Sequence, residues 1–176
     1  ILSDLSIIER RLERLEKDLK KSKNPDAEKE FELLKECITW LEAEKPLRAM
    51  EMTEDQRRIL RGFMFLSEKP ILHVLNLSDD HAREVDRAVE AYQLQELAAL
   101  PNVGITAVCG KLESELVELS GEDLQAFLAD YGLKESGLDR LIRVTYELLG
   151  LISFFTVGED ECRAWTIRRG TTALKA

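Results

Sequence analysis

The sequence is poor in the residues that build disulfide, metal and histidine chemistry. It contains three cysteines and two histidines in 176 residues. Cys37, Cys109 and Cys162 are far apart and odd in number, so they predict neither a disulfide framework nor a zinc quartet. A reducing, cytoplasmic setting is the simplest interpretation. Two histidines offer no spacing that supports a serine–histidine–aspartate set.

Long apolar runs and an excess of positive charge are also lacking. No apolar run approaches the roughly 18 residues that span a bilayer, and the first residues lack the pattern of a secretion signal. The formal net charge of -9 argues against wholesale adsorption to nucleic acid or an anionic membrane. Hydrophobic residues still make up 44% of the chain, enough for a packed core.

Two further absences concern completeness. No Gly-x-x-x-x-Gly-Lys-Ser/Thr run occurs, so the loop that cradles nucleotide phosphates is missing from this sequence. The chain begins at Ile1, without methionine and inside a helical pattern, and it stops just after an expected strand and turn. We therefore expect a piece of a longer protein.

Two apolar seams predict a helical hairpin at the start of the chain. Each seam repeats at alternating spacings of three and four residues. The seam positions are Leu5, Ile8, Leu12, Leu15 and Leu19, then Ala27, Phe31, Leu34, Ile38 and Leu41. Asn24 can cap the second helix, with Pro25 at its first position. Each run has only about three heptads, which favours an antiparallel hairpin over a dimeric coiled coil.

The middle of the chain predicts an α/β unit. Thr53 begins a short helix, and Gln56 three residues later completes a capping box. The apolar runs 71–75 and 104–109 predict buried strands, with a helix between them from about Ala82 to Leu100. Strand, helix and strand in this order predict a crossover unit of a parallel sheet.

The last third predicts three helices and a β-hairpin. The helices are expected at about 112–119, from a Ser120 cap to Gly132, and from a Ser136 cap to Gly150. Residues 152–156 and 163–167 read as two strands joined by a turn.

Polar residues follow the first predicted strand, at the end where open α/β sheets bind ligands. Asn76 and Asp79 lie three residues apart in this loop, and an amide beside a carboxylate suits the edge of a purine. The alternative, which spacing alone favours, is that Asp79 or Asp80 caps the next helix while Asn76 holds the loop. His81 beside two acids suggests a metal, but adjacent side chains do not converge readily on one ion, so no metal site is expected.

Four stretches resemble the YchF or Obg-like ATPase family, a branch of the translation-factor-related P-loop NTPases. They are residues 7–12, 70–78, 109–119 and, most specifically, 155–167, which is similar to the opening of the TGS domain in this family. In such proteins a helical, coiled-coil insertion interrupts the nucleotide-binding domain, and a TGS domain follows. The resemblance covers essentially the whole chain.

The resemblance implies an α/β fold with a helical insertion, in three parts. Residues 1–48 would form the antiparallel helical hairpin. Residues 49–150 would form the second half of a P-loop NTPase parallel-sheet domain. Residues 151–176 would be the β-hairpin that starts a truncated TGS domain. The phosphate, magnesium and catalytic positions would lie upstream, so this chain alone is expected to be inactive.

The resemblance also implies a base-binding site. The family's base-recognition motif maps onto Asn76, Leu77 and Asp79, and a second loop, whose backbone amides can meet the base, maps onto Cys109 and Gly110. GTPases of the wider class carry Asn-Lys-x-Asp, in which the lysine covers the base and the aspartate reads guanine. Leu77 replaces that lysine here and would cover the purine without favouring either base.

The resemblance leaves the choice of nucleotide open. The YchF family more often has glutamate than aspartate at the fourth motif position, which is associated with a preference for ATP. Asp79 agrees with GTPases, whereas the lost lysine argues for relaxed or adenine preference. The implied cofactor of the intact protein is ATP or GTP with magnesium, and we favour ATP.

Basic residues gather in three segments. The resemblance suggests that they line a groove for RNA on the ribosome. Acidic residues are interspersed, so ordinary solvated faces are an equally good interpretation. The candidates are Arg10, Arg11, Arg14, Arg57, Arg58, Arg61, Arg163 and Arg168.

Two functions are therefore compatible with the sequence. The first is a YchF-type ATP or GTP hydrolase that associates with the ribosome, through its large subunit, or with RNA. The alternative is a non-enzymatic helical and TGS module that docks on ribosomal RNA or protein. Neither involves a membrane, and a monomer is the simplest state.

Overall fold

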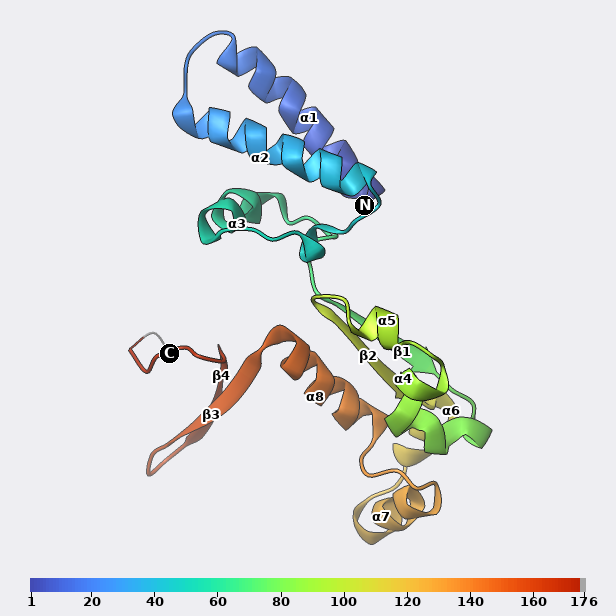
Figure 1. Cartoon of the computed structure of the whole chain (residues 1–176). Helices are drawn as coiled ribbons and strands as arrows, with labels where there is room; N and C mark the ends of the chain where they lie inside the picture. The colour runs from blue at the N-terminus through green and yellow to red at the C-terminus, as the bar shows by residue number, and fades with distance from the viewer. Residues whose placement is uncertain (175–176) are drawn as a thin grey trace. The chain divides into compact units, whose positions relative to one another are not determined.

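Helices form the first part of the chain, and two small sheets with helices form the second (Figure 1). The structure is a computed structural model and describes residues 1–174. Internal contacts divide the chain into two units, Ile1–Pro70 and the segment from Ile71 onward, which we describe separately. No helix in the described part is long and apolar enough to cross a membrane.

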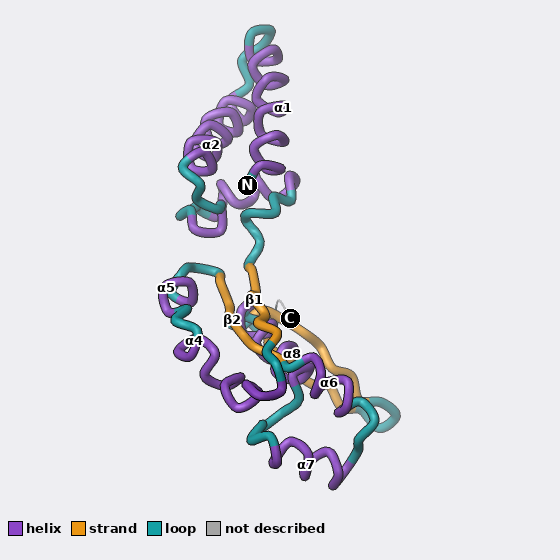
Figure 2. Tube along the Cα trace, turned by 90° about the vertical axis from the view of Figure 1, so that its right-hand side faces the viewer, coloured by secondary structure: helices purple, strands orange, loops and turns teal. Residues whose placement is uncertain are grey.

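The first unit contains the predicted helical hairpin. Helices α1 (Leu2–Leu19) and α2 (Pro25–Glu42) pack along each other, joined by a short turn (Figures 1 and 2). Apolar side chains from both helices form one buried core, which includes Ile8, Leu15, Leu34, Cys37 and Leu41. The side chain of Asn24 caps α2 by accepting the amides of Asp26 and Ala27. The hairpin prediction is confirmed.

A bidentate ion pair adds a polar link between the two hairpin helices. Arg11 Nε lies 2.6 Å from Glu30 Oε1, and the Arg11 Nη2 donates to Glu30 Oε2 at 2.9 Å. This pairing raises the pKa of the Arg11 guanidinium above its usual range. Planar, two-point pairs of this kind are directional, so this one favours a single alignment of the helices.

The segment after the hairpin packs onto it. It contains η1 (Leu47–Ala49), α3 (Glu54–Leu60) and η2 (Arg61–Phe63), and the Thr53–Gln56 capping box is confirmed. Leu47, Leu60 and Phe65 are buried in the same core as the hairpin. Residues 49–70, expected to belong with the nucleotide domain, are thus part of the first unit by their contacts.

Asp4 fastens this segment to α1. Its carboxylate is fully buried and accepts the amides of Leu66 at 3.0 Å and Ser67 at 2.7 Å. Burial by itself raises the pKa of Asp4, but the hydrogen bonds from the Ser67 hydroxyl and from the two amides outweigh it and lower the pKa. Sequence reasoning missed Asp4, although it stands four residues before Ile8 on the apolar stripe.

The second unit begins with two parallel strands, as predicted. Strand β1 (Ile71–Asn76) pairs with β2 (Val103–Val108) in register from the first residue of each to the last. The expectation of a buried first strand is wrong: β1 is only half-buried, and Val74 is 43% exposed. Within the described residues only β2 pairs with β1, so part of its surface stays open.

The single helix expected from Ala82 to Leu100 is replaced by three short pieces. They are η3 (Asp79–Arg87), α4 (Ala88–Ala91) and α5 (Gln95–Ala98). The buried residues Ala82, Val85 and Ala88 are spaced by three, which suits the three residues per turn of a 3₁₀ helix. Gln93 adopts a positive φ of 54°, which breaks the helix between α4 and α5.

Three helices follow β2. They are α6 (Gly110–Leu116), α7 (Gly121–Asp130) and α8 (Gly137–Leu149). Ser136 caps α8, and Gly150 ends it in the left-handed conformation, both as predicted. Helix α8 lies against β2, where a Cβ added at Gly104 would sit 3.3 Å from the Leu148 side chain.

A β-hairpin closes the described chain. Strand β3 (Leu151–Val157) pairs antiparallel with β4 (Cys162–Arg168), from Leu151 opposite Arg168 to Val157 opposite Cys162. The two predicted strands are confirmed. The expected TGS segment continues to residue 176, and its last two residues lie outside the described part of the chain.

Candidate functional site

The two loops that the sequence singled out lie side by side. Strands β1 and β2 are parallel, so their last residues, Asn76 and Val108, lie at the same edge of the sheet (Figures 1 and 2). Asn76 Oδ1 accepts the Gly110 amide at 3.0 Å, and the Leu77 amide donates to the Val108 carbonyl at 2.8 Å. Sequence segments 34 residues apart are thereby joined by one side chain.

Asn76 therefore holds the loops together. Its side-chain carbonyl oxygen accepts the hydrogen bond of the Gly110 amide, which the resemblance had suggested as a contact for the base. A Cβ added at Gly110 would sit 3.2 Å from Asn76 Oδ1, so this contact requires a small residue. Of the two roles open to Asn76, the structure shows the bracing one.

Asp79 is the first residue of η3. Its carboxylate forms an ion pair with the ammonium group of Lys111, the residue after Gly110. This contact lowers the pKa of Asp79 and raises that of Lys111. Hydrogen bonds from the backbone of Asp79 and Asp80 also help to lower the pKa of the Asp79 carboxylate. Sequence reasoning missed Lys111; its signal was a basic residue next to the second loop, opposite a carboxylate in the first.

Leu77 and Cys109 are engaged with the protein interior. Leu77 is half-buried and packs on a cluster that contains Val85 and Ala88. Cys109 is 2% exposed and packs against Leu112. The Cys109 side chain is thus not available to a ligand, so only its backbone remains for the role that the resemblance implies.

A hydrogen bond and an ion pair connect the helices that follow these loops. Glu113 of α6 accepts the amide of Gly137, the first residue of α8, at 2.7 Å. A Cβ at Gly137 would lie 2.6 Å from the same Glu113 oxygen, so this contact needs glycine. Arg140 is 5% exposed and donates to Asp86 at 2.8 Å. These contacts connect α8 to α6 and to η3, the two helices that follow the loops.

Half of the candidate arginines already contact neighbouring groups. Arg11 pairs with Glu30, as described above, and Arg10 Nε donates to a carbonyl of its own helix at 2.9 Å. Arg58 pairs with Asp55 at 3.1 Å, and Arg163 pairs with Glu161 at 2.9 Å. Such exposed pairs are weak and exchange readily with other anions.

The remaining arginines are free to meet a ligand. Arg14, Arg57, Arg61 and Arg168 have no side-chain partner among residues 1–174. Arg14 lines a groove of about 250 Å³ together with Arg10, Arg11, Ile7 and Phe63. This groove is lined by arginines from only the first of the three predicted basic segments. Arg168, from the third segment, lies in the second unit.

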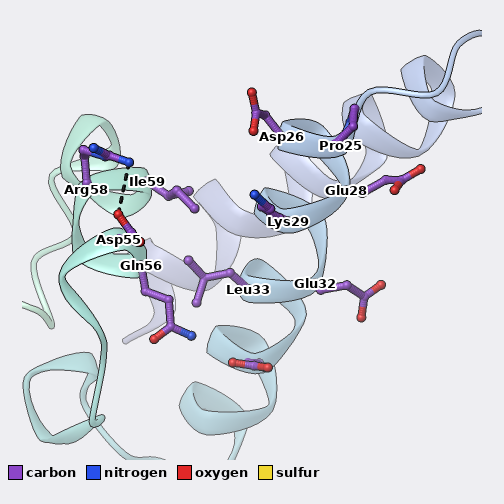
Figure 3. Close-up of a pocket in the computed structure, with 11 residues that line it drawn as sticks. Pro25, Asp26, Glu28, Lys29, Glu32, Leu33, Asp55, Gln56, Arg58 and Ile59 are labelled. Atoms are coloured by element: carbon purple, nitrogen blue, oxygen red, sulfur yellow. Dashed lines mark ion pairs between the residues drawn. The ribbon is translucent and has the colours of Figure 1, made fainter.

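A larger groove, of about 830 Å³, lies between α2 and α3 (Figure 3). Leu33 and Ile59 point into it from the two helices, while Glu28 and Glu32 point away from α3. Carboxylates outnumber cations along its lining, so it repels phosphate groups. This groove does not contain the predicted base-binding residues, and no pattern in the sequence predicted it.

Metal and thiol chemistry find little support. Residues 1–174 contain no group of three or more histidine, cysteine, aspartate or glutamate side chains arranged to hold a metal ion. His81 contacts Glu84 at 3.1 Å, which raises the pKa of His81. The three cysteines are free thiols. Burial raises the pKa of Cys37 to about 12, so this thiol is unreactive near neutral pH.

A helical hairpin, a parallel strand pair with joined loops at its carboxyl end and an antiparallel β-hairpin together define a chain of mixed α/β architecture. Residues 151–176 match the family YchF-GTPase_C, described as "Protein of unknown function (DUF933)". The "Ribosome-binding ATPase YchF" of Bacillus subtilis (strain 168) is 43% identical over 173 residues, which are 98% of this chain and 47% of that protein. The protein of the same name from Escherichia coli O157:H7 is 35% identical over 99% of this chain and 47% of its own.

A solved structure agrees. The structure of the Schizosaccharomyces pombe YchF GTPase is similar to this chain with a TM-score of 0.81 and 25% identity, over 98% of this chain and 47% of that one. The chain is thus similar to YchF proteins over nearly its whole length, and it spans about half the length of the curated relatives it matches.

Proposed function

We propose that the protein carrying this chain is a cytoplasmic nucleotide hydrolase of the YchF type that binds ATP or GTP and associates with the ribosome. The relatives' names support both parts, since they name a ribosome-binding ATPase and a GTPase. The chain contributes the loops that hold the purine base. The phosphate loop lies in the part of the protein that this sequence does not contain.

The observation that carries the proposal is the bond between Asn76 and the Gly110 amide. It joins the two loops at the carboxyl edge of a parallel strand pair, which is where open α/β sheets bind ligands. In this arrangement Asn76 fixes the distance between the loops, and Asp79 supplies a carboxylate beside them. The partly exposed Leu77 would offer an apolar edge to the purine.

Residues 1–174 contain no cluster of three or more acidic, histidine or cysteine side chains that could hold a metal ion. In the proposed enzyme, magnesium and the attacking water are held by residues outside this chain. This chain would therefore set base affinity and base choice but not hydrolyse nucleotide by itself.

The remaining parts have proposed roles as well. Residues 1–48 would be the coiled-coil insertion, 49–150 the second half of the nucleotide domain, and 151–176 the start of a TGS domain. The groove that Arg10, Arg11 and Arg14 line is a surface for ribosomal RNA of the large subunit, since guanidinium groups bind phosphates and Arg14 has no side-chain partner among residues 1–174.

The alternative is a binding module without enzymatic activity, whose nucleotide loops are structural remnants. The free arginines and the solvent-exposed hairpin favour it, because they serve docking whether or not nucleotide binds. The sequence preceding this chain in the intact protein separates the two. A phosphate-binding loop in that sequence would support the enzyme, and its absence from the intact protein would refute the enzyme and favour the binding module.

The direct experiment is the change Asn76→Ala in the full-length protein. It removes the bond to the Gly110 amide, worth about 1 kcal/mol, so binding of ATP and of GTP should both weaken roughly five- to tenfold in calorimetry. The matched control is Gln125→Ala, an exposed amide on α7, which should bind as wild type does. Unchanged affinity in Asn76→Ala would remove these loops from the nucleotide site.

A further inference from the structure

We propose that Lys111 sets the base preference of the site by holding the Asp79 carboxylate away from guanine. This inference rests on the proposed function, since it assigns base choice within that site. Lys111 lies in one of the stretches that carry the resemblance, which assigned it no role; its pairing with Asp79 is seen in the structure. Lys111 lies in the first turn of α6, 32 positions along the chain from Asp79.

The position of Lys111 allows its ammonium group to neutralise the Asp79 carboxylate. Asp79 begins η3 and Lys111 is the second residue of α6, so the ion pair spans the two loops next to the Asn76 bond. Lys111 is the first cause of the lowered pKa of Asp79, and Asp79 is the first cause of the raised pKa of Lys111. The His81 ring, two residues after Asp79, contacts Glu84 instead.

The chemistry of the two bases then predicts opposite effects. Guanine presents two N–H donors to a carboxylate, so it must displace the lysine to be read by Asp79. Adenine presents a ring acceptor at the corresponding edge, which a bare carboxylate repels. Neutralised by Lys111, the carboxylate repels adenine less. The pair therefore weakens GTP binding and favours ATP binding.

The size of the effect follows from exposure. The Lys111 side chain is 66% exposed and that of Asp79 is 35% exposed. Exposed ion pairs contribute little, so breaking this one changes an affinity by a factor of about five at most. A few-fold change in the ratio of the two dissociation constants is the expected signal.

The test uses full-length protein and calorimetry with ATP and with GTP, so that phosphate contacts cancel in the ratio. Lys111→Ala should lower the ratio of the GTP dissociation constant to that of ATP by about two- to fivefold. Lys111→Arg keeps the charge and should leave the ratio as in wild type. In an Asp79→Asn background, Lys111→Ala should have no effect on the ratio, because the carboxylate is gone.

Three results overturn the proposal. Unchanged affinities for both nucleotides in Lys111→Ala show that the pair does not govern base choice. Equal weakening of both nucleotides shows that Lys111 contacts the nucleotide itself. A raised ratio shows that Lys111 instead orients Asp79 for guanine. If wild-type protein binds neither nucleotide, the proposed function fails as well, an outcome distinct from the other three.

Discussion

Changing Asp4 to asparagine should destabilise the first unit markedly. The buried carboxylate accepts two backbone amides, from Leu66 at 3.0 Å and Ser67 at 2.7 Å. Asparagine keeps one oxygen acceptor and turns an NH₂ group toward the other amide. The loss of one charged hydrogen bond, about 1.5–3 kcal/mol, and the weakening of the second sum to roughly 3 kcal/mol.

The assay is urea unfolding followed by the fluorescence of Trp40, which lies in the first unit. A Trp165→Phe background removes the signal of the second unit. The matched control is Asp18→Asn, an exposed carboxylate on the same helix, which should change stability by less than about 0.5 kcal/mol.

The pH dependence gives an independent check of Asp4. Its folded pKa is lowered, so its contribution to stability is complete above the unfolded pKa of about 3.9 and is lost as the pH falls through the folded value. The difference between wild type and Asp4→Asn should therefore be constant above about pH 5 and shrink below pH 4. A difference below 0.5 kcal/mol at neutral pH, or one that grows in acid, would refute this reasoning.

Two other positions give simpler predictions. Gly137→Ala places a methyl group 2.6 Å from Glu113 and should lower the unfolding free energy of the second unit by about 1–3 kcal/mol. Gly158→Ala, in the same unit, meets only the Glu161 carbonyl at 3.8 Å and should be nearly neutral in the same denaturation experiment. A thiol reagent at pH 8 should label exposed Cys162 rapidly and leave Cys37 unlabelled until the protein unfolds, as mass spectrometry of the peptides would show; rapid labelling of Cys37 would contradict its burial.

The elements that the sequence predicted well are those with a strong local signal. The hairpin seams repeat over several turns, and Asn24, Thr53 and Ser136 each cap a helix with their side chains. The parallel strand pair followed from the alternation of strand and helix patterns. In these places local preference and final packing agree.

The site was predicted less completely because its contacts link distant segments. Asn76 and Asp79 were identified from one loop, but their partners Gly110 and Lys111 are more than 30 residues away. Whether Asn76 meets a base or a backbone amide is decided by the approach of the second loop, which spacing does not encode. The break at Gln93 has no signal in the apolar pattern, since glutamine is an ordinary helix residue.

The central claim is that the loops of β1 and β2 hold the purine base, and photolabelling tests it most directly. Full-length protein is irradiated with an ATP analogue that carries an azide on the adenine ring, and the labelled peptides are mapped by mass spectrometry. If these loops hold the base, the label is expected within residues 76–79 or 109–113 and should be abolished by excess unmodified ATP. Competed label confined to other segments, with both loops unmodified, would contradict it.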